Sequence, residues 1–451
     1  MKYLPFGFFL LMSFTIQAQS KKWEQLFDGK TLKGWSVKAG NADYQVIDRT
    51  IVGTTVTGSP NTFLVSDKEY ENYILEVDFR LEDTTLNSGI QFSSHYDSKE
   101  NNGRGKVYGY QYELDPSFRS WTAGIYEEGR RGWLYPLTLN PAAKRGYHYY
   151  DFNTARIECF GNTVKTYING ILASVLVDSI KEKGFIALQV HSISDPKNAG
   201  KHIYWKNIKI KTLDAPITDK ELPYIVNLNQ NSVSDWEKSK GYQLLFDGKS
   251  TTGWKGAYKP GFPEKGWEVK DGTLTVLSSA GKESANGGDI VTIEEYSAFD
   301  LSFDFKLTEG GNSGVKYFVT LTENNTGSAI GLEYQILDDK RHPDALLGKN
   351  GNRTLASLYD LIPANKQSRF FNEPGNWNTG RVVVYPDNRV EHYLNGVKVL
   401  EYIRGSEEFR KLVAESKYKI WPSFGEAPKG HILLQDHGNE VSFRNIKIAK
   451  L

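Results

Sequence analysis

Glutamine and histidine stand two residues apart in two similar apolar stretches of the chain. Gln189 and His191 lie in IALQVHS (186–192), and Gln435 and His437 lie in ILLQDHG (432–438). Side chains alternate between the two faces of a β-strand, so each pair is expected to point to one side. An imidazole can exchange protons near neutral pH, and an amide has a fixed hydrogen-bonding geometry. These pairs indicate a surface that binds a ligand or acts on one.

Two more alternating stretches in each half of the chain place polar residues opposite their apolar neighbours. The same logic sets Lys316, Glu333 and Gln335 on one face in the second half. In the first half it selects Gln91, Gln111 and Glu113. The outer face of an antiparallel sheet is usually polar without any function. The recurrence of Gln and His at matching places favours a ligand-binding wall in each half.

The elements that must position these residues are repeated. LFDGKTLKGW from Leu26 returns as LFDGKSTTGW from Leu245, NSGIQF returns as NSGVKYF, and each half ends in NIKI. The order of the motifs is kept, which predicts a tandem duplication. We place a first domain at 20–213, a linker at 214–240 and a second domain at 241–451.

The spacing of the repeats also locates an insertion in the second half. The two Asn-Gly turns, at 169–170 and 395–396, differ by 226 positions, whereas Gln189 and Gln435 differ by 246. The extra residues fall in 401–421, where Phe409, Leu412 and Val413 have helical spacing. We expect this segment to line or cover the predicted wall.

The remaining sequence indicates an all-β fold. Short alternating stretches are separated by Gly, Asn and Asp, and NRVEHYLNGVKVLEY (388–402) has the pattern of a hairpin with an Asn-Gly turn. About 200 residues per copy with few helical patterns favour two tandem two-sheet sandwiches of the jelly-roll kind.

The amino terminus and the composition restrict location and partners. Residues 1–18 have a lysine, a short apolar run and small residues at the exit, which predicts a signal peptide and a secreted or periplasmic protein. The apolar run is too short to span a bilayer, and no later segment qualifies, so we expect no membrane span in the mature chain. The formal charge of +1, without basic runs, argues against nucleic acid as a partner.

Several of these motifs resemble the 3-keto-disaccharide hydrolase domain family, formerly a domain of unknown function. The second copy is the closer match, through LFDGKSTTGW, GNSGVKYF, GLEYQILDDKRHPDA, PGNWNTGRVVVYPDNRVEHYLNGVKVLEY and GHILLQDHGNEVSFRNIKI. The first copy is similar but looser, with QYELDPS for EYQILDD and QVHS for QDHG. The resemblance implies a concanavalin A-like jelly roll. It also implies action on glycosides with a ketone at C3, made by an upstream sugar 3-dehydrogenase.

Such a substrate permits elimination followed by hydration, because the ketone acidifies the hydrogen on C2. The site then needs a base, an electrophile for the enolate oxygen and a proton donor for the leaving oxygen. His437 is the first candidate base, Glu333 the second, and Lys316 could stabilise the enolate. Substrate-binding roles are predicted for Gln335, Gln435, Tyr359 and Asp338, and in the first copy for Gln111, Glu113, Gln189 and His191.

Three alternatives remain open at the level of sequence. Asp338, Asp339, His342 and Asp344 could hold a divalent metal, although a turn capped by aspartates explains them more simply. A tandem carbohydrate-binding module without activity would use the same residue types. A conventional glycosidase is less favoured, since the second wall carries only one clear carboxylate, Glu333.

Overall fold

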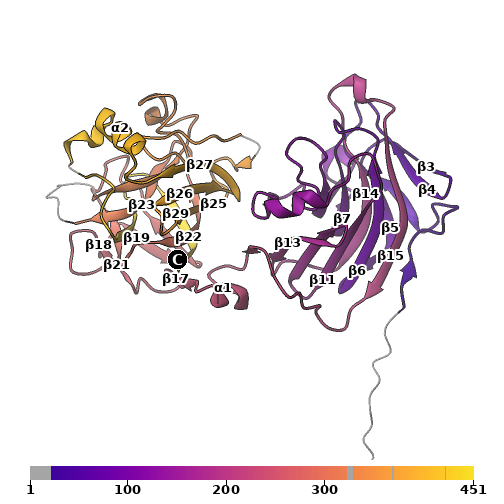
Figure 1. Ribbon diagram of the computed structural model, residues 1–451, viewed down its shortest axis with the longest axis horizontal. Coiled ribbons are helices and arrows are strands. Elements are labelled where there is room, and N and C mark those ends of the chain that lie inside the picture. Colours follow the sequence, from indigo (N-terminus) through magenta and orange to yellow (C-terminus); the bar gives the residue numbers. More distant parts are fainter. Residues whose placement is uncertain (1–21, 322–328, 368–369, 422) are drawn as a thin grey trace, which may run out of the picture.

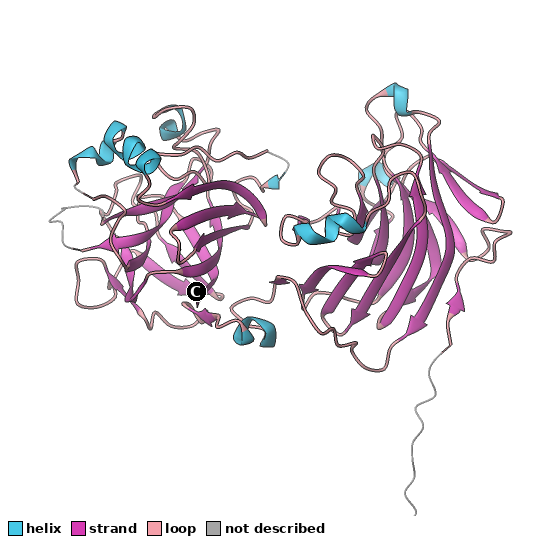
Figure 2. Ribbon diagram, in the orientation of Figure 1, coloured by secondary structure: helices cyan, strands magenta, loops and turns pink. Residues whose placement is uncertain are grey.

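The computed structural model describes residues 22–321, 329–367, 370–421 and 423–451. The predicted signal peptide, residues 1–18, lies outside the described residues. The chain forms two β-sandwiches side by side, with the linker running between them (Figure 1). Strands dominate both domains, and the short helices lie in the connections at the edges of the sheets (Figure 2). The prediction of an all-β, tandem jelly-roll architecture is confirmed.

Each domain packs a larger sheet against a smaller one. The first domain's larger sheet runs in the order β16 (Ile225–Asn227), β13 (Ile171–Val177), β12 (Thr163–Ile168), β11 (Asn153–Phe160), β6 (Tyr73–Leu81), β15 (His202–Thr212), β4 (Thr50–Thr54) and β3 (Asp43–Ile47), with β1 (Glu24–Gln25) paired to β15. Its smaller sheet runs in the order β10 (Gly132–Tyr135), β9 (Ile125–Glu128), β8 (Lys106–Leu114), β7 (Ser88–Asp97), β14 (Gly184–Val190), β5 (Thr62–Tyr70) and β2 (Trp35–Lys38).

The second domain repeats this arrangement. Its larger sheet runs in the order β19 (Trp267–Lys270), β20 (Thr273–Val276), β29 (Val441–Lys450), β22 (Phe299–Leu307), β25 (Asn378–Val384), β26 (Arg389–Leu394) and β27 (Val397–Ile403), with β17 (Gln243–Leu244) paired to β29. Its smaller sheet runs in the order β18 (Trp254–Gly256), β21 (Ile290–Tyr296), β28 (Gly430–Leu434), β23 (Asn312–Thr320) and β24 (Ile330–Leu337).

The short helices belong to the connections. They are α1 (Asp235–Ser239), α2 (Glu407–Glu415) and the 3₁₀ turns η1 (Asn101–Gly103), η2 (Pro141–Gly146), η3 (Pro196–Asn198), η4 (Pro343–Leu346) and η6 (Lys417–Ile420). The predicted insertion at 401–421 is α2 followed by η6, and its Phe409 and Tyr418 side chains are buried. The helical prediction for this segment is confirmed.

The duplication is visible in the strand order. In the larger sheets, the first domain's order β13-β12-β11-β6-β15-β4-β3 matches the second domain's order β27-β26-β25-β22-β29-β20-β19, and in the smaller sheets β8-β7-β14-β5-β2 matches β24-β23-β28-β21-β18. Alternating apolar side chains of the facing sheets fill one core in each domain. Two further strands, β9 and β10, extend the first domain's smaller sheet, and β16 of the linker extends its larger sheet.

The predicted linker, 214–240, contacts both domains. Its β16 pairs in parallel with β13 of the first domain. Asn231 and Asn445 exchange hydrogen bonds between backbone N–H and side-chain oxygen. Glu237 in α1 accepts from Lys447 Nζ at 2.9 Å, and both side chains are at most 7% exposed. These contacts fix the linker against the second domain's larger sheet.

The buried Glu237–Lys447 ion pair gives a prediction about stability. We expect Lys447→Met to lower the second domain's free energy of unfolding by about 3–5 kcal/mol, because the Glu237 carboxylate would stay buried without its counterion. Urea unfolding followed by fluorescence measures the change. The exposed Lys238–Asp235 pair in the same helix is the matched control, and Lys238→Ala should change the value by at most about 1 kcal/mol. Equal effects of the two substitutions would contradict the prediction.

Candidate active site

A cavity of about 420 Å³ opens on the outer face of the second domain's smaller sheet. The three strands that carry the predicted wall are neighbours in this sheet, in the order β28-β23-β24. The residues of the wall that line the cavity are Lys316, Glu333, Gln335, Gln435 and His437. The five residues that the sequence pattern assigned to one face therefore line one cavity.

Strand register explains how these side chains meet. Lys316 of β23 lies opposite Glu333 of β24, and Gly314 lies opposite Gln335. The backbone of Gln435 continues the pairing by donating to Gly314 O at 3.0 Å. Gly314 leaves the space that the Glu333 carboxylate fills, since a Cβ at this position would lie 2.3 Å from Glu333 Oε1.

The extent of β28 differs from the sequence expectation. The strand ends at Leu434, so Gln435 and His437 lie in the following loop and not within the strand. Asp436 explains the change of direction, because its buried carboxylate accepts from Gly288 N and Gly438 N and so closes a turn. His437 still reaches the cavity, where its ring lies 6.0 Å from that of His342.

Glu333 is the buried acid of the cavity. It is 4% exposed, and burial raises the pKa of its carboxyl above the ordinary value, with Lys316, Lys417 and His437 acting in the opposite direction. Lys316 Nζ lies 3.9 Å from Glu333 Oε2 and donates to Ala329 O at 3.2 Å. A carboxylate and an ammonium group thus stand side by side under the cavity.

The amides of the wall are placed to meet a polar ligand. Gln335 can donate to Asn312 Oδ1 at 3.3 Å or, with its amide rotated, to Glu333 Oε1 at 3.1 Å. Gln435 Oε1 is buried and has no hydrogen-bond partner within the described part of the chain. A buried acceptor without a partner is costly unless a ligand or water completes it.

The inserted segment supplies residues that sequence reasoning placed near the cavity without naming them. Lys417, Tyr418 and Trp421 line the cavity from η6. Lys417 Nζ lies 4.2 Å from the centre of the Tyr359 ring, and burial lowers the pKa of its ammonium group, while the negative charge of Glu333 raises it. The cavity therefore has a second cation, Lys417, which the first domain does not supply from an equivalent segment.

A hydrogen-bonded network fixes this side of the cavity. Tyr359 Oη donates to Asp344 at 2.8 Å, and Arg353 donates to Asp344 and to Asp360. Asp360 in turn accepts from the backbone of Lys417 at 2.9 Å. Tyr359 lines the cavity as expected, held at its hydroxyl end.

The acidic side chains of the loop after β24 each have their own partners and do not form one cluster. Asp338 does not line the cavity, because its carboxylate accepts from Gly310 N at 2.8 Å and from Arg341. Asp339 is paired with Lys366, and His342 Nδ1 accepts from the backbone of Asp344. Over the described residues, no three His, Cys, Asp or Glu side chains gather in a way that could hold a metal ion. The aspartates serve the turn, and Asp338 departs from its predicted contact with substrate.

The first domain's wall also gathers on one sheet, on β7, β8 and β14. Its side chains are hydrogen-bonded to one another. Asn87 and Gln111 donate to Glu113 at 2.7 and 2.8 Å, and Gln91 donates to Gln111. Burial raises the pKa of Glu113 to about 7. Gln189 donates to Glu128 at 3.4 Å, and its Oε1 is buried without a partner in the described residues. His191 Nδ1 contacts Ser192 O at 2.6 Å.

Sequence reasoning missed Asn312 as well as the η6 residues. Asn312 opens β23 and lines the cavity, and its counterpart Asn87 holds Glu113. The signal was present in the repeated Asn-Ser-Gly of NSGIQF and NSGVKYF, which served only to mark the repeat.

Both halves of the chain match one family model. The model is that of the 3-keto-alpha-glucoside-1,2-lyase-like domain, and it matches residues 22–211 and 241–449. The chain belongs to this family. The membership makes it a carbohydrate-active enzyme of the hydrolase type and confirms the resemblance noted in the sequence.

The chain is also similar to individual proteins. A 3-keto-disaccharide hydrolase from Bacteroides thetaiotaomicron is 38% identical over 233 residues, an alignment that covers 47% of this chain and 79% of that protein. The crystal structure of a candidate glycosyl hydrolase from Parabacteroides distasonis is 33% identical, covering 49% of this chain and 100% of that one, with a TM-score of 0.43. A second crystal structure of a candidate glycosyl hydrolase from the same organism is 28% identical, covering 47% of this chain and 99% of that one, with a TM-score of 0.36.

The sequence also predicted that the mature chain has no membrane span. Among the described residues, no helix is long and apolar enough to cross a membrane.

Proposed function

We propose that the second domain cleaves glycosides whose sugar ring carries a ketone at C3, by elimination followed by hydration. The adjacent Glu333 and Lys316 side chains carry the proposal, because they supply a base and a cation 3.9 Å apart. The hydrogen on C2 and the oxygen on C3 are bonded to neighbouring ring atoms. Glu333 can therefore take the hydrogen while Lys316 contacts the oxygen. The named activity of the Bacteroides relative agrees with this substrate class.

The cavity is less suited to direct glycoside hydrolysis, which ordinarily uses two carboxylates flanking the glycosidic bond. Among the described residues, the acidic side chains that line the cavity besides Glu333 are Asp344 and Glu283. Asp344 is engaged by Arg353 and Tyr359, and Glu283 is exposed at the rim. Within the part of the chain that the structure describes, Glu333 is thus the one buried carboxylate of the cavity lining that no arginine holds.

The reaction is assigned to residues as follows. Glu333 takes the proton from C2, and the electron pair moves onto the C3 oxygen beside Lys316 as an enolate. The enolate then collapses, C1 and C2 become doubly bonded, and the bond from C1 to the leaving oxygen breaks. His437 gives a proton to that oxygen. Water adds to C1 and C2 regains a proton, which yields the free 3-keto sugar and completes a net hydrolysis.

This assignment places Glu333 ahead of His437 as the base. A base works best when its pKa approaches the working pH, and burial moves Glu333 in that direction. Glu333 is also the neighbour of the proposed electrophile, whereas His437 lies in the loop beyond β28 and is only partly buried. Gln435 and Gln335 would hold sugar hydroxyls, and Tyr359 would contact an apolar face of the ring.

For the first domain we propose carbohydrate binding without catalysis. Gln91 stands where the second domain has Lys316, so no ammonium group faces the C3 oxygen, and the hydrogen bonds among Gln91, Gln111 and Glu113 occupy the wall. We further propose that the protein is exported through residues 1–18. Its substrate would then come from an oxidoreductase that converts a sugar C3 hydroxyl to a ketone.

The test uses the whole two-domain chain without the first 18 residues. It is incubated with 3-keto disaccharides and with the unoxidised parents, with and without chelator, and released sugars are followed by mass spectrometry. Release from the keto compounds only, lost in His437→Ala and kept in His191→Ala, is the expected result. In D₂O the released 3-keto sugar should carry one deuterium at C2, beyond an enzyme-free blank. Equal release from the unoxidised parents, or product without deuterium, would refute the elimination route.

The rim of the cavity predicts a preference among leaving groups. Leu346, Leu347 and Ile420 are 89%, 55% and 68% exposed. They lie on η4, directly after it and on η6. The Lys349–Glu415 ion pair of 3.1 Å joins the loop after η4 to the end of α2. Exposed apolar side chains beside a polar cavity are typical of a contact with an apolar ligand. We infer that an aromatic leaving group suits this rim.

The measurement compares a phenyl 3-keto-glucoside with a 3-keto disaccharide. We expect Trp421→Ala to lower kcat/KM for the phenyl glycoside by about tenfold, the equivalent of roughly 1.4 kcal/mol of lost contact, and to affect the disaccharide less. Exposed Phe118 in the first domain provides the control variant Phe118→Ala. An equal loss on both substrates would show that Trp421 does not distinguish leaving groups.

A further inference from the structure

A second cavity, of about 400 Å³, lies between the two domains. Its floor is the outer face of the second domain's larger sheet, with Lys306, Arg381 and Arg444 from β22, β25 and β29. The inner faces of these strands form the domain core, so the core separates this cavity from the candidate active site. Its other wall comes from the β9–β10 hairpin of the first domain and from β16 of the linker.

Three aromatic side chains line this interdomain cavity. Trp377 has two cations near it, with Arg444 Cζ at 4.0 Å and Lys306 Nζ at 5.2 Å from the centre of its ring. Trp133 faces it from the hairpin, and Tyr224 enters from the linker, with Arg381 4.5 Å from its ring. Each domain therefore contributes a tryptophan, and each tryptophan is only partly buried.

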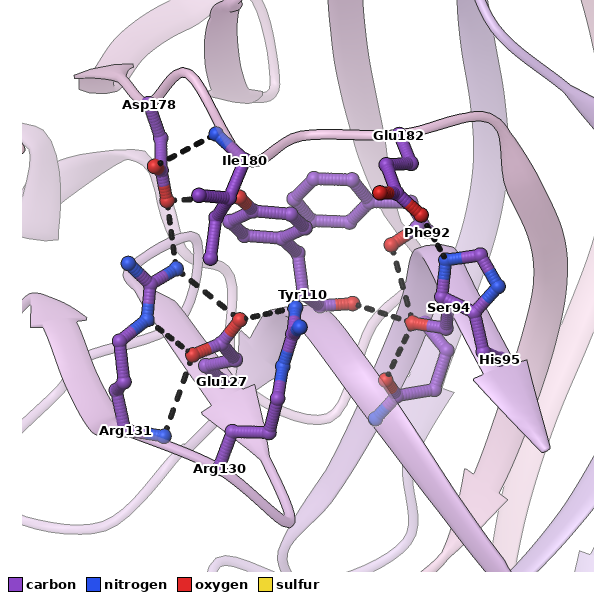
Figure 3. Close-up of polar contacts among 11 residues, drawn as sticks. Phe92, Ser94, His95, Tyr110, Glu127, Arg130, Arg131, Asp178, Ile180 and Glu182 are labelled. Atoms are coloured by element: carbon purple, nitrogen blue, oxygen red, sulfur yellow. Dashed lines mark hydrogen bonds and ion pairs between the residues drawn. The ribbon is translucent and has the colours of Figure 1, made fainter. Parts of the chain in front are cut away.

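The charges of this cavity are almost fully paired. On the hairpin side, the fully buried Glu127 binds both Arg130 and Arg131, and Arg131 also donates to Asp178 at 2.6 Å (Figure 3). On the floor, Arg381 is paired with Asp300, Arg444 with Asp304 and Lys447 with Glu237. Within the described residues, Lys306 alone among the six lining cations has no acidic partner.

Paired charges and aromatic faces suit a particular class of ligand. A carboxylated or sulfated ligand would need unpaired cations, and it would also meet the acidic Asp304 and Glu237 in the lining. A neutral sugar instead presents C–H faces that pack on aromatic rings, and hydroxyl groups that both donate and accept hydrogen bonds. Ion pairs held in place by Glu127 and Asp178 offer such donors and acceptors without mobile side chains.

We propose that the interdomain cavity binds a neutral oligosaccharide that contacts both domains. Trp377 and Trp133 stack on its sugar rings, and Lys306, Arg444 and Arg130 bind its hydroxyls. The site is an accessory one that adds to the proposed catalytic cavity and does not depend on it. A bound chain would also join the two domains across their gap, where the direct Thr138 Oγ1 to Gly396 O bond of 2.7 Å already links them.

The experiment titrates the intact two-domain protein with unoxidised cellotetraose, maltotetraose and xylotetraose, and with tetragalacturonate as the anionic probe. The protein carries Gln435→Leu, so that binding to the catalytic cavity is weakened. Calorimetry should detect saturable binding of at least one neutral probe, with little dependence on salt. We expect Trp377→Ala to weaken that binding by about tenfold or more and Phe118→Ala, an exposed aromatic outside the cavity, to leave it unchanged.

Folding of each variant is checked by circular dichroism and thermal unfolding. If Trp377→Ala does not fold, Lys306→Met tests the same wall, since Lys306 is the unpaired cation and its replacement should weaken binding several-fold. Absence of saturable binding for all three neutral probes would overturn the proposal. Preference for tetragalacturonate, or equal affinities of the parent protein, Trp377→Ala and Lys306→Met, would overturn it as well.

Discussion

Glu333→Gln is expected to lower kcat on a 3-keto disaccharide by roughly 10²- to 10⁴-fold, the range that a general base contributes. The amide keeps the shape of the side chain and its place beside Lys316, so the fold and the affinity for substrate should change little. What is lost is the group that takes the C2 proton. Steady-state kinetics with the purified two-domain protein, and C2 deuterium exchange on a non-cleavable 3-keto glycoside, measure the effect separately on turnover and on proton abstraction.

The first domain supplies the matched control. Glu113→Gln makes the same change in the corresponding wall, at a carboxyl group whose pKa burial raises to about 7. It should leave kcat within about twofold if catalysis belongs to the second domain. A large loss in Glu113→Gln, or retained C2 exchange in Glu333→Gln, would contradict the assignment of Glu333 as the base.

The pH dependence follows from the same group. A base must be ionised, so kcat/KM should fall as the pH falls through the pKa of Glu333, and burial sets this pKa above that of an ordinary glutamate. The positive charge of Lys417 lowers the Glu333 pKa. Lys417→Met should therefore move the acidic limb of the profile to higher pH. A shift to lower pH would contradict this electrostatic relation.

Lys316→Met is the second substitution for which we expect a large effect, a fall in kcat of about 10²- to 10³-fold with a smaller change in KM. The ammonium group interacts most strongly with the enolate oxygen, whose negative charge develops only as the C2 proton leaves. Its removal also takes away a cation that lowers the Glu333 pKa, so the acidic limb should rise in pH as well. Kinetics over a pH series measure both changes.

A conservative variant separates charge from shape. Lys316→Arg keeps a cation but enlarges its head, and it should retain more activity than Lys316→Met. Gln91→Met at the matching place in the first domain is the control for a buried methionine on this face of the sheet, with thermal unfolding as the check on folding. If Lys316→Met raised KM and left kcat unchanged, Lys316 would be a binding residue and not the electrophile.

The proposals assign catalysis to the second domain and carbohydrate binding to the first. The same strand order carries Lys316 and Glu333 side by side in one domain, and in the other a wall whose amides bind one another and Glu113. The inserted α2–η6 segment accounts for much of the difference, since it brings Lys417, Tyr418 and Trp421 to one cavity only.

The sequence by itself determined the all-β class, the duplication and which residues share the face of the wall. Side chains alternate with a period of two in any strand, so Lys316, Glu333 and Gln335 could be assigned to one face without knowing the sheet. The repeated motifs aligned the halves closely enough to locate the insertion. These inferences depend on local geometry, which the order of residues fixes.

Tertiary structure alone decided the burial, the partners and the second cavity. Burial raises the pKa of Glu333, and Lys417, which is 84 positions away in the chain, lowers it. Asp338 turned to the backbone of Gly310 and not to the cavity, and His437 left its strand because Asp436 closes a turn. The interdomain cavity combines Arg130 with Arg444. Contacts between distant segments set all of these features, and alternation along one strand carries no information about them.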